Sequence, residues 1–266
     1  MENVSFLGGS GYIGSLIKKY DFSIKKDIEF YSRRKTENCI QYTDLDELPN
    51  CEILFDLSQW ANGKDIEKLG IDKMKELIKK SISKAERYIF ISTLSIDINK
   101  KLNYPFDKYC NAKLNFEKML LEYDNTYILR IPTCFYKNPK KGTLIRLLFD
   151  RLNGSKETIK QPMKYTSGIT IIELINFFKI LIKSNNRFSE IYGNSRILRL
   201  GDGYAYRISK LEEFLRIQLS KESLIYEKFN YPEGHKVNLI DNNNWHLQSV
   251  CFPIRMLQTF KSSLKS

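Results

Sequence analysis

The stretch Val4-Ser5-Phe6-Leu7-Gly8-Gly9-Ser10-Gly11-Tyr12-Ile13-Gly14 determines how this chain begins to fold. Its apolar start predicts a strand, and three glycines at a spacing of three follow. Gly8 permits a tight turn, Gly11 lets a phosphate approach the backbone, and Gly14 lets the next helix pack closely. The stretch predicts the strand, glycine turn and helix that open a dinucleotide-binding unit. The alternative is a glycine-rich surface turn, which can have the same sequence pattern.

Strands and helices alternate through the first half of the chain. Short apolar runs predict strands over 4–7, 28–31, 39–42, 52–55, 88–91 and 127–131, and helical spacing predicts helices over 72–84 and 107–123. The second half is less regular, with helices predicted over 143–152, 171–182 and 209–219, a strand over 196–200 and a loop over 242–246. Such alternation is typical of an α/β protein whose parallel sheet is covered by helices on both faces.

Composition limits the function classes. The chain has 43 Lys and Arg against 31 Asp and Glu, a formal charge of +12, which suits a phosphate-bearing ligand or simply a solvated basic surface. No nucleic-acid recognition motif is visible. The five cysteines have no metal-ligand spacing, so we expect no metal site. We expect no signal peptide and no membrane span, hence a reducing, cytoplasmic compartment.

A second motif, Tyr109-Cys110-Asn111-Ala112-Lys113, carries acid–base chemistry. Tyr and Lys four residues apart lie on one face of a helix, where an ammonium lowers the pKa of a phenol. A tyrosine tuned in this way exchanges a proton near neutral pH. Most Tyr-x-x-x-Lys pairs are solvated helix faces, but this one follows Ser92-Thr93 and precedes a predicted helix and strand.

The glycine turn and Tyr109-x-x-x-Lys113, in this order, resemble the extended short-chain dehydrogenase/reductases, the family of NAD-dependent epimerases and dehydratases. The resemblance implies a Rossmann-type doubly wound sheet with a smaller, interleaved C-terminal substrate domain. It assigns residues 1–133 to the NADP-binding domain, to which 169–203 return, and 134–168 with 204–266 to the substrate domain. It also implies a homodimer that pairs through the helices at 72–84 and 107–123.

The resemblance also assigns the catalytic groups. Tyr109 and Lys113 take the family's acid–base and ribose-holding roles. A Ser or Thr follows the fifth strand in the family; Thr93 fits best and Ser95 is the alternative, while Ser92 and Thr93 as simple strand caps remain possible. Pro132 stands where the family has a proline near the nicotinamide, but Thr133 replaces its usual Asn.

Cofactor choice is predicted from the end of the second strand. An NAD enzyme carries an acid there for the ribose 2′-hydroxyl, whereas this chain has Ser32, Arg33 and Arg34, which suit a 2′-phosphate, unless the run is a solvated turn. We therefore predict NADP as cofactor. The residues assigned to it are Gly8, Ser10, Gly11, Tyr12, Ile13, Gly14, Ser32, Arg33, Arg34, Asp44, Leu45, Leu57, Ser58, Gln59, Lys113 and Pro132.

Positions at which this chain departs from the family pattern reduce the number of reactions that the resemblance allows. Sugar dehydratases carry Asp-Glu after the catalytic Thr, where this chain has Leu94 and Ser95. The resemblance then favours an NADP(H)-dependent reductase of a nucleotide-linked 4-keto-6-deoxy sugar. A nucleotide-sugar epimerase and a non-catalytic NADP-sensing regulator are the alternatives. The substrate diphosphate could meet Lys137, Lys140, Arg146 and Arg151, but ordinary surface positions explain each of them better.

Overall fold

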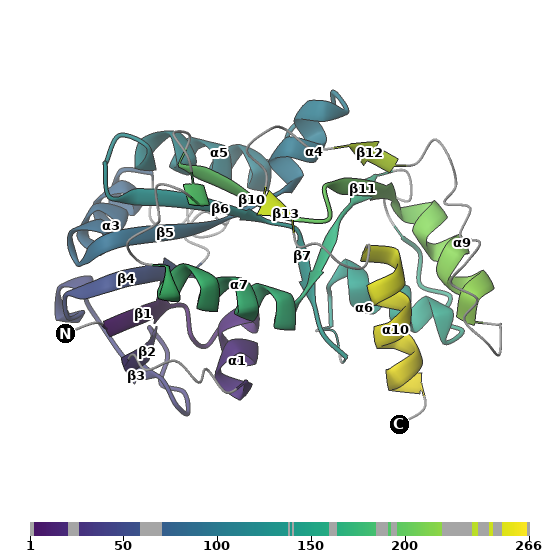
Figure 1. Ribbon diagram of the computed structural model, residues 1–266, viewed down its shortest axis with the longest axis horizontal. Coiled ribbons are helices and arrows are strands. Elements are labelled where there is room, and N and C mark those ends of the chain that lie inside the picture. Colours follow the sequence, from purple (N-terminus) through teal and green to yellow (C-terminus); the bar gives the residue numbers. More distant parts are fainter. Residues whose placement is uncertain are drawn as a thin grey trace.

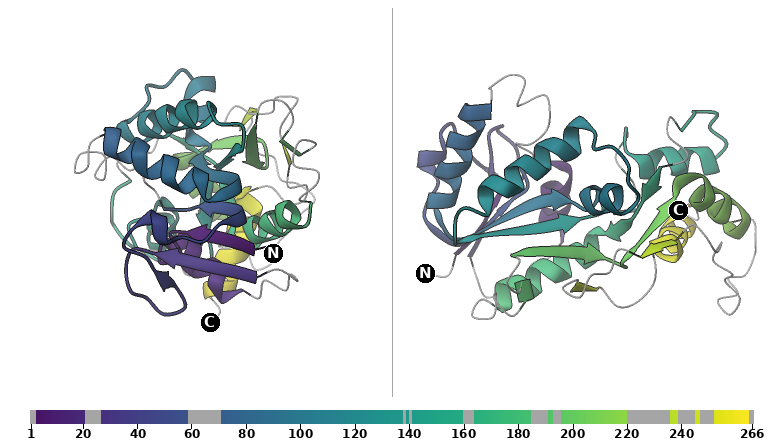
Figure 2. Two further views of the ribbon diagram at one scale, coloured as in Figure 1. Left: turned by 90° about the vertical axis from the view of Figure 1, so that its left-hand side faces the viewer. Right: turned by 90° about the horizontal axis from the view of Figure 1, so that it is seen from above.

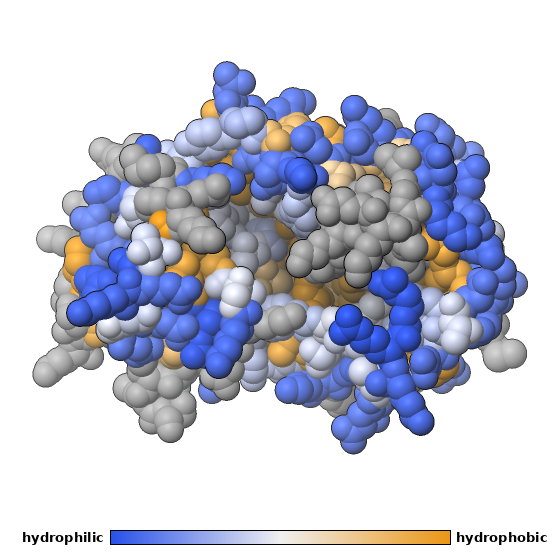
Figure 3. All heavy atoms as spheres, turned by 180° about the vertical axis from the view of Figure 1, so that it is seen from behind, coloured by the Kyte–Doolittle hydropathy of each residue, from blue (hydrophilic) through white to orange (hydrophobic). Residues whose placement is uncertain are grey.

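The structure of the protein is a computed structural model (Figure 1). It describes residues 3–20, 27–58, 71–137, 139, 141–159, 164–184, 191–192, 196–219, 236–238, 245–246 and 252–264. In Figure 3, hydrophilic side chains form much of the face, and apolar residues appear between them and in the hollow near its centre. Each helix in these ranges is too short or too polar to span a bilayer.

An eight-stranded sheet forms the centre of the molecule, in the order β13-β10-β6-β5-β4-β1-β2-β3. All of its strand pairs are parallel. The strands are β1 (Asn3–Leu7), β2 (Asp27–Ser32), β3 (Ile40–Gln41), β4 (Cys51–Asp56), β5 (Ala85–Thr93), β6 (Thr126–Ile131), β10 (Ile197–Gly201) and β13 (Trp245–His246). The order reverses between β1 and β4, as in doubly wound dinucleotide-binding sheets, so the predicted fold class is confirmed.

Helices cover both faces of this sheet (Figures 1 and 2). On one face lie α1 (Tyr12–Lys19) and α7 (Ile171–Lys183), and on the other α3 (Ile71–Ser83) and α5 (Lys108–Leu120). Each face has its own core: α1 and α7 pack on Val4, Phe6 and Phe55, whereas α3 and α5 pack on Leu54 and Phe90. Alternate residues of one strand therefore belong to different cores, as strand geometry requires.

A third core lies beyond the carboxyl ends of the strands. It is formed by α6 (Leu144–Leu152), α9 (Ile208–Leu219) and α10 (Phe252–Leu264), which are the green and yellow helices on the right of Figure 1 together with the teal α6. The small strands of this part are β7 (Thr133–Phe135), β8 (Tyr165–Thr166), β9 (Gly168–Thr170), β11 (Tyr204–Arg207) and β12 (Lys236–Asn238). A Cβ on Gly168 would overlap the Phe252 ring, so this glycine lets α10 approach β9.

Several elements differ from the sequence predictions. The stretch after Thr93, expected as a loop, contains α4 (Ser95–Lys101), whose alternating Ile96 and Ile98 are buried. The 242–246 stretch, also expected as a loop, contributes β13 to the sheet edge. A two-residue strand leaves no periodicity in the sequence, because its pairing is decided by the neighbouring strand.

Candidate active site

The glycine turn joins β1 to α1 at the point where the strand order reverses. The amides of Gly8 and Gly9 both donate to the carbonyl of Tyr31, at 3.0 Å. Gly8 has φ +83°, and a Cβ on it would lie 2.8 Å from the Leu57 backbone. A Cβ on Gly14 would lie 2.7 Å from the carbonyl oxygen of Gly8. Gly14 thus permits helix α1 to pack on the turn itself, rather than on the sheet as the sequence suggested.

The opening of α1 fits a dinucleotide phosphate. Gly11 precedes the helix and supplies no side-chain cap, and both Ser10 and Gly11 are exposed. The first amides of a helix have no partner within the helix and attract anions. A Cβ on Gly11 would meet only the Gly8 carbonyl, so its other side faces open space.

The end of β2 places a hydroxyl pair and two cations beside this turn. Ser32 is buried, and its hydroxyl donates to that of Ser10 at 2.7 Å. The backbone amide of Arg34 donates to the Ser32 hydroxyl at 3.1 Å, which starts the turn after the strand. Arg33 and Arg34 are exposed. No acid occupies the position that would receive a ribose 2′-hydroxyl.

The other residues assigned to the cofactor, which follow β3 and β4, lie in different surroundings. Asp44 is exposed, begins a short 3₁₀ turn and pairs with Lys80 at 3.3 Å. Leu45 is only 1% exposed and packs in the α3 core, so its side chain does not line an open site, contrary to the prediction. Leu57 borders the glycine turn and the catalytic cavity, and Ser58 hydrogen-bonds Asp56. Gln59 lies outside the described residues.

The predicted catalytic side chains meet in one cavity of about 260 Å³, to which Ile13, Thr93, Ser95, Tyr109, Lys113 and Pro132 contribute. Thr93 ends β5, and Tyr109 belongs to the first turn of α5, which Asp107 caps by accepting from the amide of Cys110 at 2.8 Å. The Thr93 hydroxyl and the Tyr109 phenol line this cavity together, and Thr93 favours the ionised form of the phenol. The Ser95 amide also donates to the Thr93 hydroxyl, at 3.2 Å.

Lys113 lies one helical turn further along α5 and is only 2% exposed. Its Nζ donates to the carbonyl oxygen of Ile91 at 2.8 Å and sits 4.3 Å from the centre of the Phe90 ring. Burial lowers the pKa of Lys113 to about 8, while the charges of Asp56 and Glu117 oppose this effect. The amine is thus held under α5, at the floor of the cavity.

The Tyr109 pKa corrects one expectation. Desolvation and the neighbouring Cys110 and Asp107 raise the pKa of Tyr109 to about 12, an effect that the Thr93 hydroxyl opposes. The sequence predicted a lowered pKa through Lys113, but the Lys113 amine is directed to the Ile91 carbonyl. Tyr109 therefore carries its proton throughout the neutral range.

A buried polar network, which the sequence did not predict, adjoins the cavity at Ser92. Arg130 binds Glu117 through two nitrogens, at 3.0 and 2.5 Å, and Asp97 at 2.8 Å. Ser92 donates to Glu117 at 2.5 Å, and Arg199 pairs with Asp97 at 2.9 Å. The signal that would have found it is Glu117, one turn after Lys113 on the buried face of α5.

Other cations are engaged elsewhere. Arg146 pairs with Asp150, and Arg151 with Glu212, each at 2.9 Å. Both side chains thus have acidic partners in α6 and α9, so surface ion pairing explains them. Lys137 is exposed, and Lys140 lies outside the described residues.

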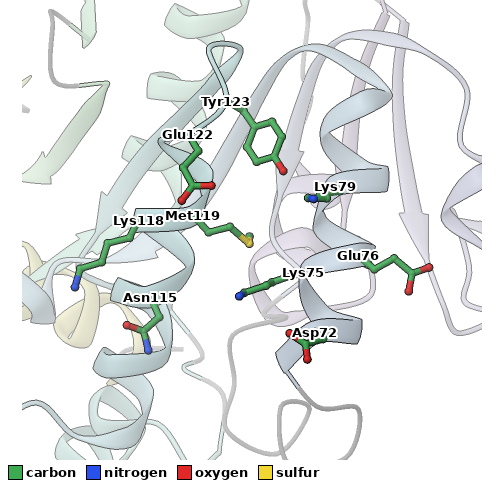
Figure 4. Close-up of a pocket in the computed structure, with 9 residues that line it drawn as sticks. All are labelled: Asp72, Lys75, Glu76, Lys79, Asn115, Lys118, Met119, Glu122 and Tyr123. Atoms are coloured by element: carbon green, nitrogen blue, oxygen red, sulfur yellow. The ribbon is translucent and has the colours of Figure 1, made fainter.

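A second hollow lies on the outside of α3 and α5, away from the glycine turn (Figure 4). Lys75 of α3 and Met119 of α5 extend into the space between the two helices. Its remaining lining is mostly charged, with Asp72, Glu76, Lys79, Lys118 and Glu122. This groove contains no group of the catalytic set.

Comparisons with known proteins agree with this geometry. No protein-family model matches the chain, and no curated protein matches its sequence. Three similar solved structures are MoeE5 in complex with UDP-glucuronic acid and NAD (17% identity, TM-score 0.60, 82% of each chain), the human epimerase family protein SDR39U1 with NADPH (16%, 0.59, 82% of this chain and 80% of that one), and a short-chain dehydrogenase/reductase superfamily protein from Agrobacterium tumefaciens with bound NAD (10%, 0.61, 99% and 97%). The chain therefore has the fold of the extended short-chain dehydrogenase/reductases.

Proposed function

We propose that the protein is an NADP(H)-dependent reductase of a nucleotide-linked 4-keto-6-deoxy sugar. The observation that carries this proposal is the meeting of Thr93, Tyr109 and the buried Lys113 in one cavity next to the glycine turn. The neutral Tyr109 phenol, beside the Thr93 hydroxyl, can give a proton to a substrate oxygen that becomes negatively charged during the reaction.

Each side chain has one task in this reaction. When bound, NADPH supplies the hydride that reduces the sugar keto carbon. Tyr109 gives its proton to the new alkoxide oxygen, and the Thr93 hydroxyl orients that oxygen while it is still a carbonyl. Lys113 holds the nicotinamide ribose through the N–H groups that the Ile91 carbonyl leaves free. With its pKa raised to about 12, Tyr109 carries a proton before the reaction, and the alkoxide takes it because an alkoxide is a stronger base than a phenolate.

The cofactor is proposed to be NADP rather than NAD. Support comes from the Ser32 hydroxyl and the exposed Arg33 and Arg34, where guanidinium groups bind a phosphate with charge-assisted hydrogen bonds. The similar structures hold both kinds of cofactor, NADPH in the human protein and NAD in the other two. The local residues therefore decide the proposal.

The substrate class follows from what the cavity offers. MoeE5 holds a UDP-sugar on the same fold, which supports a nucleotide sugar for this chain. Dehydration needs an acid beside the catalytic Thr, but Leu94 is buried among apolar residues and Ser95 is a hydroxyl. An epimerase uses the same side chains without net consumption of NADPH and is the second candidate. A regulator that binds NADP without catalysis would need Lys113 for the ribose but would have no use for the Tyr109 proton.

The proposal extends to organisation and assembly. We propose that residues 1–133 and 169–203 bind the cofactor, and that 134–168 with 204–266 bind the substrate. Support comes from the participation of β10 in the large sheet and from the separate core of α6, α9 and α10. A cytoplasmic homodimer that pairs through α3 and α5 completes the proposal.

The deciding experiment mixes the purified protein with NADPH and a panel of nucleotide-linked 4-keto-6-deoxy sugars. Loss of NADPH absorbance equal to the sugar alcohol formed supports the reductase. Interconversion of two sugars without loss of absorbance would identify an epimerase instead. NADPH binding with no turnover of any substrate would favour the regulator.

A further inference from the structure

A buried carboxylate, Asp56, lies at the end of β4 close to the catalytic cavity but outside its lining. It is 1% exposed and accepts hydrogen bonds from the Ser58 amide at 2.8 Å, the Ser58 hydroxyl and the Tyr88 hydroxyl. Within the described part of the chain, these three donors to Asp56 are all neutral. An ionised carboxylate in such a place needs a cation nearby to offset its desolvation.

The strand register places Asp56 beside Lys113. Asp56 and Phe90 are cross-strand partners of the parallel pair β4 and β5, so their side chains share the α5 face of the sheet. The Nζ of Lys113 lies 4.3 Å from the centre of that Phe90 ring. The negative charge of Asp56 favours the charged form of Lys113 more strongly than the charge of Glu117 does.

The other charged and titratable groups on this face are already engaged. Glu117, on the same helix as Lys113, is held by two nitrogens of Arg130. Tyr88 of β5 donates to Asp56, and Tyr42, after β3, also senses the Asp56 charge; burial raises the pKa of both tyrosines, so both are neutral. Tyr109 is neutral at the cavity mouth. Among the described residues of this face, Asp56 is thus the acid left to balance Lys113.

We propose that Asp56 is a positioning residue, a buried counter-ion that keeps the Lys113 amine charged and aligned against the Ile91 carbonyl so that it can hold the cofactor ribose. The ribose contact rests on the proposed function, whereas the pairing of charges does not. The role differs from a purely structural one because it depends on the carboxylate charge and not on the hydrogen bonds that Asp56 accepts.

The test compares Asp56→Asn, which removes the charge at constant shape, with Tyr88→Phe, which removes a hydrogen bond and keeps the charge. Isotope-labelled lysine side chains are titrated by NMR in the cofactor-free protein, with Lys113→Arg identifying the Lys113 signal. In the wild type this signal should titrate near pH 8, well below those of surface lysines. Asp56→Asn should move its midpoint down by about one pH unit or more, and Tyr88→Phe should leave it nearly unchanged.

NADPH binding gives a second readout. The wild-type Kd for NADPH should rise as the pH increases through about 8, and in Asp56→Asn this rise should begin at lower pH. If Asp56→Asn does not fold, Asp56→Ser takes its place. A midpoint that moves equally in Asp56→Asn and Tyr88→Phe, or in neither, overturns the proposal. An unaltered NADPH titration beside a shifted lysine midpoint would leave the charge pairing intact and contradict the ribose contact instead.

Discussion

The hydroxyl of Ser32 donates to the hydroxyl of Ser10 across 2.7 Å, which ties the end of β2 to the glycine turn. The adenosine ribose of a cofactor bound on this turn would meet the two neutral hydroxyls of Ser10 and Ser32, with Arg33 and Arg34 beside them. We therefore expect NADPH to bind more tightly than NADH. Replacing both arginines by Ala should weaken NADPH binding by about 1–3 kcal/mol, the range for charged hydrogen bonds, and hardly affect NADH.

The matched variant for cofactor choice is Ser32→Asp. A carboxylate at this position accepts from a ribose 2′-hydroxyl and repels a 2′-phosphate, so the preference should turn toward NADH. Fluorescence titration gives the Kd of the wild type and of both variants for NADPH and for NADH. Equal affinity of the wild type for both cofactors, or a preference for NADH, contradicts the prediction.

Stability should depend on the ion network beneath the cavity. The Glu117 side chain is 2% exposed and that of Arg130 is 7% exposed. Glu117→Gln leaves a buried guanidinium without one of its acids, which should lower the free energy of unfolding by on the order of 3 kcal/mol. Glu76→Gln breaks the exposed pair with Lys73 and should cost less than about 1 kcal/mol. Urea denaturation measures both, and equal losses would show that burial of the network is unimportant.

The sequence was informative wherever local chemistry decides the structure. The strand, the glycine spacing and the Tyr109-x-x-x-Lys113 interval each follow from the backbone needs of a short segment, and the fold they predict is present. The sequence was uninformative where a contact depends on segments that lie far apart along the chain. The Arg130–Asp97 pair joins residues 33 positions apart, and the direction of the Lys113 amine depends on the Ile91 carbonyl of another strand. Leu45 was assigned to the cofactor by resemblance, because a sequence motif does not show whether a side chain is buried.

Assembly is predicted through α3 and α5. Their outer groove is lined mainly by charged side chains, so association through it should weaken with added salt. Light scattering at micromolar concentration should give twice 31.4 kDa at low salt. Lys75→Glu with Lys79→Glu should favour the monomer, whereas Lys210→Glu on α9 should not. A single species of 31.4 kDa under all conditions rejects the predicted dimer.

The buried Lys113 should leave a signature in the pH dependence of stability. The unfolded chain holds this proton up to its ordinary pKa of 10.5, whereas the folded chain releases it near 8. Between these values the unfolded state binds more protons, so the Lys113 contribution to stability rises with pH, by at most about 1.4 kcal/mol per pH unit. The difference in unfolding free energy between wild type and Lys113→Met should rise over this window. Lys118→Met, at an exposed position of the same helix, should give no such slope.

The reaction is tested most directly at Tyr109. Its hydroxyl shares the cavity with Thr93 and keeps its proton at neutral pH, because desolvation raises the Tyr109 pKa to about 12. Tyr109→Phe removes this proton and little else, since the ring is already 39% exposed at the cavity mouth. Reduction of the keto sugar should slow by about 10²–10⁴, the usual contribution of a positioned proton donor, while the Kd for NADPH stays nearly constant. Thr93→Val should also slow turnover, through loss of the hydroxyl that orients the carbonyl. If Tyr109→Phe turns over at the wild-type rate, the proton comes from another donor, and the assignment of Tyr109 is wrong even though the fold is right.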